Sequence, residues 1–115
     1  MVCVPHIVAD ISANGFGHFA QMAPILDCLA GNREVRITLR TEVDPEICRQ
    51  FLEIPFEFGP APKDPNMRMR GPLDVDPDGL LEDYSELFTD WDEVVSRDAQ
   101  ILKELRADVV LTNIA

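Results

Sequence analysis

The sequence predicts an α/β fold in which a parallel sheet carries helices on both faces. Short apolar runs rich in β-branched residues alternate along the chain with segments whose apolar residues recur every three or four positions. Glycine, proline and other turn-forming residues separate these segments. With 115 residues, 46% of them hydrophobic and 27% charged, the chain has the size and composition of one globular domain, residues 1–115.

The first forty residues predict a strand, a glycine-rich loop, a helix and a second strand. Residues 4–11 form a short apolar run, and residues 35–40 alternate apolar and polar side chains, as strands do. Between them, residues 19–31 have helical apolar spacing and end at a glycine followed by asparagine, a common C-terminal cap. Pro24 lies inside this segment and lacks a backbone donor, so we expect a bent helix.

The middle of the chain predicts a short helix, a short strand and a long loop. The helix covers about 45–53, with Asp44 as its cap and proline in its first position. Residues 54–58 form the strand. The loop at 59–79 contains five prolines, which predict no regular structure there. An ordered loop of this length is usually functional, but the expected interpretation is a mobile crossover.

The last third of the chain predicts one long helix and a final strand. Helical apolar spacing continues over residues 77–105, and we expect its aromatic stripe of Tyr84, Phe88 and Trp91 to pack in the core. Residues 107–114 form the strand. The alternation of strands and helices implies right-handed crossovers and a Rossmann-like sheet of order 3-2-1-4, which places strand 107–114 at an open edge.

Charge and cysteine content exclude several classes of protein. The net charge of −11 repels nucleic acid and anionic lipid, so neither is an expected partner. Cys3, Cys28 and Cys48 have no metal-ligand spacing, so we expect no metal site and three buried, reduced thiols. No signal peptide or membrane-spanning apolar stretch is evident, which makes the cytoplasm the expected location.

The segment "SANGFGHFAQMAP" (12–24) holds the most distinctive residues. In a parallel sheet, ligands bind at the carboxyl ends of strands, where this loop begins. The candidate substrate-binding residues are therefore Asn14, Gly15, Phe16 and Gly17, together with the basic pair Arg68 and Arg70 in the proline-rich loop. Both glycines are expected to supply backbone freedom at the turn.

Residues 15–20 also match the dinucleotide-binding pattern G-x-G-x-x-G/A, which keeps an NAD(P)-dependent oxidoreductase open as an alternative. Three residues separate the apolar strand from the first glycine, which is more than that fingerprint usually allows. The residues at the end of the second strand, Arg40, Thr41 and Glu42, do not indicate clearly how a ribose would be held.

The two histidines lead to different interpretations. His18 falls in the first turn of the predicted helix, where the helix dipole favours a neutral imidazole that can accept a proton, as a general base must. A packing or capping role for His18 remains the alternative. His6 lies inside the first strand and is expected to be structural.

The stretch "GFGHFAQMAPILDCLAGNREVRITLRTE" resembles the start of GT-B glycosyltransferases. The resemblance covers residues 4 to about 42 and is closest to bacterial transferases and to the transferase-like domain fused to arabinokinases. It implies that His18 is the catalytic base and that Asn113 stands where relatives have an aspartate that orients the imidazole. The change to asparagine is a departure from the family, as is Ala13-Asn14, where close relatives often show Gly-His.

The resemblance further implies that the chain is the N-terminal, acceptor-side half of a glycosyltransferase. It needs no cofactor, and a missing C-terminal domain holds the nucleotide-sugar donor, for example a UDP-sugar. A non-catalytic Rossmann-like binding module remains the alternative. The open strand 107–114 also predicts that the chain by itself self-associates.

Overall fold

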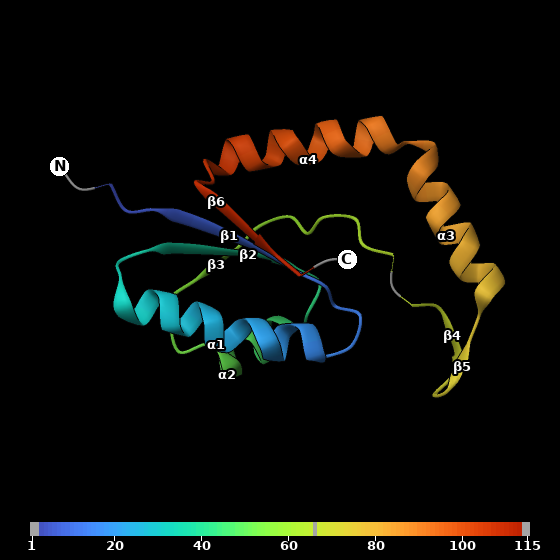
Figure 1. The fold of residues 1–115 in the computed structure, drawn as a ribbon, viewed down its shortest axis with the longest axis horizontal. Coiled ribbons are helices and arrows are strands. Elements are labelled where there is room, and N and C mark those ends of the chain that lie inside the picture. The colour runs from blue at the N-terminus through green and yellow to red at the C-terminus, as the bar shows by residue number, and fades with distance from the viewer. Residues whose placement is uncertain (1–2, 66, 114–115) are drawn as a thin grey trace.

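The computed structural model describes residues 3–65 and 67–113, and a four-stranded parallel sheet forms its centre (Figure 1). The order across the sheet is β3-β2-β1-β6, and each neighbouring pair is parallel. The strands are β1 (His6–Ile11), β2 (Arg36–Thr41), β3 (Glu57–Phe58) and β6 (Val109–Thr112). This arrangement confirms the Rossmann-like α/β class and the predicted strand order, with β6 at an edge.

One face of the sheet forms the apolar core with α1 (Gly17–Asn32) and α2 (Pro45–Phe51). Alternate residues of β1 and β2 point to this face, because side chains alternate along a strand. Phe19, Met22, Ala23 and Leu26 of α1 pack against them, spaced as one face of a helix. The buried core consists of Ile7, Ala9, Ile11, Phe19, Met22, Ala23, Leu26, Ile37, Leu39, Cys48 and Leu52.

The opposite face of the sheet is polar and is crossed by α4 (Trp91–Leu105), as Figure 1 shows. The imidazole of His6 is buried there, with Nδ1 2.8 Å from the carbonyl oxygen of Leu105 and Nε2 2.7 Å from Oγ1 of Thr38. These bonds join β1 to β2 and to the end of α4. The structural role expected for His6 is confirmed.

Helix α1 begins two residues before the predicted 19–31 segment, ends one residue after it and continues through Pro24, while the bend expected at Pro24 stays a prediction. Proline removes the donor that would bond the carbonyl of Ala20. Both Ala20 and Pro24 are exposed, so water can satisfy that carbonyl.

The proline-rich segment 59–79 contains regular structure, contrary to the prediction. Strands β4 (Met69–Gly71) and β5 (Asp74–Val75) form an antiparallel hairpin, and α3 (Pro77–Thr89) begins inside the segment. Pro72 lies in the hairpin turn and Pro77 in the first turn of α3, two positions that need no backbone donor. The prolines therefore fall where they are compatible with these elements.

The predicted helix 77–105 is broken at Asp90, which has a non-helical conformation (φ −109°, ψ 30°). The hydroxyl of Thr89 donates a hydrogen bond to the carbonyl of Ser85, and such side-chain bonds compete with the helical ladder. On the N-terminal side of the break, α3 and the β4–β5 hairpin project away from the sheet (Figure 1). We call residues 67–89 the arm.

The aromatic stripe is exposed, so its predicted place in the core was wrong. Tyr84, Phe88 and Trp91 are 40%, 59% and 45% exposed and contact one another, with ring centroids 6.5 and 5.2 Å apart. The helical spacing of these residues was predicted correctly. The break at Asp90 nevertheless directs the arm away from the sheet, so the aromatic stripe is not buried.

Other predictions need smaller corrections. Cys48 is buried as expected, and burial raises the pKa of its thiol. Cys3 and Cys28 are exposed, contrary to the prediction, because Cys3 precedes β1 and Cys28 lies off the apolar face of α1. The strands predicted at 54–58 and 107–114 shorten to β3 and β6, and Ile114 lies outside the described residues. Within the described ranges, no helix has the length and apolar character to cross a membrane.

Candidate functional site

The loop from β1 to α1, residues 12–16, lies at the carboxyl edge of the sheet. Gly15 has φ 82°, in the left-handed region that glycine adopts without strain. A Cβ atom built on Gly15 or on Gly17 would lie more than 4 Å from every described atom outside the adjoining residues and the backbone of its own helix. The space in front of the loop and of the first turn of α1 is therefore open to a ligand.

Phe16 attaches the loop to the two helices beneath it. Its ring centroid lies 5.0 Å from that of Phe51 on α2 and 6.1 Å from that of Phe19 on α1. The ring is nevertheless 42% exposed. Phe16 therefore anchors the loop and still offers an apolar surface beside it.

His18 is the second residue of α1 and is half-buried. Within residues 3–65 and 67–113, its imidazole makes no hydrogen bond or ion pair. The N-terminus of α1 has no side-chain cap and no acidic residue in its first turn. An uncapped helix end with an unpartnered imidazole can receive a polar ligand.

Asn113 follows the end of β6 and lies beside the main chain of His18. Its Nδ2 donates a hydrogen bond of 2.9 Å to the carbonyl oxygen of His18, and its Oδ1 accepts one of 3.3 Å from the backbone N–H of Ser12. The structure thus brings together two residues 95 positions apart. Their contact runs through the main chain of His18, while the role of Asn113 toward the imidazole stays a prediction.

Arg68 and Arg70 lie on the arm and bind carboxylates there. Arg68 pairs with Asp83 at 2.7 Å, and Arg70 lies 3.9 Å from Asp76. A neighbouring residue approaches the glycine loop, because the backbone N–H of Met67 donates to Oδ1 of Asn14 at 3.3 Å. The base of the arm therefore contacts the loop, but both guanidinium groups are already paired with acids.

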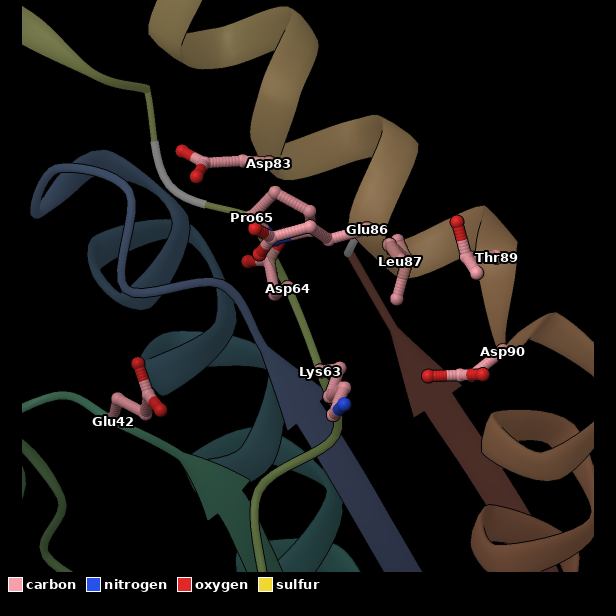
Figure 2. Close-up of a pocket in the computed structure, with 9 residues that line it drawn as sticks. All are labelled: Glu42, Lys63, Asp64, Pro65, Asp83, Glu86, Leu87, Thr89 and Asp90. Carbon is pink, nitrogen blue, oxygen red and sulfur yellow. The ribbon is translucent and has the colours of Figure 1, made fainter.

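A cleft of about 560 Å³ lies between the end of β2, segment 63–65 and the arm (Figure 2). It combines five carboxylates with one ammonium group, and Oδ2 of Asp64 is shielded from water without a hydrogen-bond partner among the described residues. Its lining is Glu42, Lys63, Asp64, Pro65, Asp83, Glu86, Leu87, Thr89 and Asp90. The excess of negative charge favours cationic or neutral ligands over phosphates.

Sequence reasoning missed this cleft, because its residues come from separate segments that only the direction of the arm brings together. The spacing of Asp83, Glu86 and Asp90 along one helical face was the available signal. The part of the chain that the structure describes contains no group of three His, Cys, Asp or Glu side chains able to hold a metal ion.

A buried charge cluster lies beneath the carboxyl edge, on the face toward α4. The guanidinium of Arg40 is fully buried and bonds Oδ2 of Asp10 at 3.2 Å, the carbonyl of Pro60 at 2.9 Å and Oδ1 of Asp98. Burial raises the pKa of Asp10 to about 6, although Arg40 opposes the shift. The signal in the sequence was a set of polar residues, His6, Asp10, Thr38 and Arg40, that share one face of two otherwise apolar strands.

The parallel sheet, its strand order and the open loop at its carboxyl edge define a Rossmann-like α/β domain with a candidate ligand site. No protein-family model, curated protein or solved structure matches the chain. Its function must therefore be argued from the chemistry of the site.

Proposed function

We propose that this chain is the N-terminal, acceptor-binding half of a GT-B glycosyltransferase, with His18 as the general base. The observation that carries the proposal is the imidazole of His18, which makes no hydrogen bond or ion pair with the residues that the structure describes and lies in the first turn of α1, beside an open glycine loop at the carboxyl edge of the sheet. A neutral imidazole in that position can accept a proton from an acceptor hydroxyl.

In the proposed reaction, the acceptor oxygen forms a bond to the anomeric carbon of the donor sugar. The bond from that carbon to the diphosphate oxygen breaks, and the nucleoside diphosphate leaves with the electron pair. The hydroxyl proton passes to His18. Asn14, Gly15, Phe16 and Gly17 would shape the acceptor site around this atom.

The donor is proposed to bind to a second, C-terminal domain. The acidic cleft of this chain would repel the diphosphate of a nucleotide-sugar, because Lys63 and the Arg68 that pairs with Asp83 cannot balance five carboxylates. Arg68 and Arg70, the expected positive groups, are paired with carboxylates of the arm. The chain by itself should therefore bind no UDP-sugar at micromolar concentration.

The test uses the protein in which this chain precedes the proposed second domain. Release of nucleoside diphosphate is measured with a panel of UDP-sugars and hydroxyl acceptors. His18→Ala should lower turnover by roughly 10²–10⁴-fold with the donor affinity unchanged, because a positioned base contributes about that much. Gln21→Ala, at an exposed position one turn along α1, is the matched control.

Turnover of His18→Ala within threefold of wild type would reject the base. A coding sequence with no second domain after Ala115 would leave no donor site. It would instead favour a non-catalytic binding module, an alternative supported by one observation, that the side chain at position 113 is an uncharged amide bound to main-chain atoms of Ser12 and His18.

The oxidoreductase alternative is less compatible with the site. In a dinucleotide-binding domain, the residues ending the second strand select the ribose. Here Arg40 is fully buried and bound to Asp10 and Asp98, so its guanidinium is not free to bind a nucleotide. Thermal stabilisation by NAD(P)H, with none by UDP-sugars, would support the oxidoreductase instead.

A further inference from the structure

The side chain of Asn113 binds the main chain on both sides of the loop at 12–16, which leads into the first turn of α1 and His18. Its carbonyl oxygen receives the N–H of Ser12, the first residue after β1, and its NH₂ group donates to the carbonyl of His18, in the first turn of α1. The backbone N–H of Asn113 also donates to the carbonyl of Asp10 at 3.2 Å. Asn113 therefore connects the edge strand to the beginning and the end of the loop.

We propose that Asn113 is a positioning residue that fixes the main chain of His18 and in this way aims the imidazole without contacting it. The proposal deepens the proposed function, on which it rests in taking His18 as the base. The hydrogen bonds by which Asn113 holds the loop do not depend on whether the protein has transferase activity.

The chemistry of the two bonds requires an amide at position 113. One bond needs an acceptor and the other needs a donor, and a side-chain amide supplies both. An aspartate would still accept from Ser12, but its second oxygen would face the carbonyl oxygen of His18 with no proton between them. Asp at this position should therefore release the loop, whereas the resemblance implies that Asp would orient the imidazole.

The same loop provides a matched control in Asn14. Among the described residues, the one hydrogen bond of its side chain is accepted by Oδ1 from the N–H of Met67, and the backbone N–H of Asn14 donates to Oγ of Ser12. A carboxylate at position 14 keeps that acceptor. Asn14→Asp therefore makes the same chemical change as Asn113→Asp without removing a donor that the loop uses.

The test is NMR spectroscopy of the chain and of its Asn113→Asp, Asn113→Ala and Asn14→Asp variants, all carrying Val110→Lys, because a charge on the edge strand β6 opposes pairing between copies. His6 and His18 are the only histidines in the sequence, so each imidazole gives an assignable signal. In both Asn113 variants the imidazole signals of His18 should shift and broaden, while those of His6 stay in place and report an intact fold. Amide exchange of Ser12 should become about tenfold faster in Asn113→Ala, since one hydrogen bond is lost. Asn14→Asp should change neither reading.

Two results would overturn the positioning role. If the titration midpoint of His18 moves to higher pH in Asn113→Asp while the loop keeps its exchange rates, the carboxylate reaches the imidazole and orients it directly. If neither Asn113 variant alters the His18 signals, Asn113 does not position this residue. Failure of His18→Ala to affect turnover would instead reject the base, and the NMR result would stand unaffected.

Discussion

The guanidinium group of Arg40 lies 3.2 Å from the carboxylate of Asp10, at a place where both residues are withdrawn from water. Asp98 of α4 shares the same guanidinium, so one positive charge serves two carboxylates from different elements. Oδ1 of Asp10 remains buried with no hydrogen-bond partner among the described residues. This cluster joins β1, β2 and α4, and its contribution to the free energy of unfolding can be measured.

Replacing Arg40 with Met should destabilise the fold by about 3 kcal/mol. The change leaves a buried carboxylate without its positive partner, which is the costly way to break a buried pair. Urea unfolding at pH 7 measures the loss. Arg36→Met, in the exposed pair of Arg36 with Glu57, is the control and should have little effect, since water screens that pair. Equal losses in the two variants would contradict a special role for the buried cluster.

The stability of the fold should depend on the ionisation of Asp10. Because burial raises the pKa of Asp10 from 3.8 to about 6, the folded state holds this proton more tightly than the unfolded chain does. Its contribution to the free energy of unfolding is therefore fully present below about pH 4 and is lost as the pH rises through about 6.

The difference in unfolding free energy between wild type and Asp10→Asn should fall by roughly 2 kcal/mol between pH 4 and pH 7. Asparagine cannot ionise, so the difference isolates this one carboxyl. Urea titrations at half-unit pH intervals would show the fall. A difference that stays constant over this range would mean that Asp10 titrates alike in the folded and unfolded chain.

The two glycines of the loop should respond differently to alanine. Gly15→Ala places a side chain at φ 82° and should cost about 1–2 kcal/mol in stability. Gly17 begins α1 in open space, so Gly17→Ala should be neutral or should stabilise the helix by about 0.5 kcal/mol. Thermal unfolding of both variants checks this pair of expectations, and an equal response would contradict the loop geometry.

The chain by itself should self-associate through β6. Among the strands that the structure describes, β6 pairs only with β1, and its Val109 and Val110 are 52% and 42% exposed. An apolar strand at a sheet edge recruits other strands, here against the repulsion of a net charge of −11. Sedimentation velocity over a tenfold concentration range should show larger species.

Val110→Lys should abolish this association, because a charge on an edge strand opposes pairing. Leu73→Lys makes the same change at the tip of the β4–β5 hairpin, where the side chain is 98% exposed, and should have no effect. A wild-type chain that stays monomeric would rule out β6 as an association site.

The glycine loop and His18 could be placed from the sequence because the signals are local. A strand, a turn and a helix start follow one another within a few residues, and each has its own pattern. The long-range partners gave weaker signals. Asn113 is a candidate site residue only through the resemblance to GT-B glycosyltransferases. Its hydrogen bonds to Ser12 and His18 depend on how β6 ends beside the loop.

The sequence by itself determined the parallel sheet and its apolar face, because strand and helix periodicity decide which side chains can be buried together. Tertiary structure alone decided where the last third of the chain goes. The helical period from 77 to 105 is almost unbroken in sequence, but one non-helical residue, Asp90, turns the arm away from the core and exposes its aromatic stripe. The same direction of the chain assembles the acidic cleft and carries α4 to Arg40, since Asp98 and Arg40, 58 positions apart, meet only after α4 has packed on the sheet.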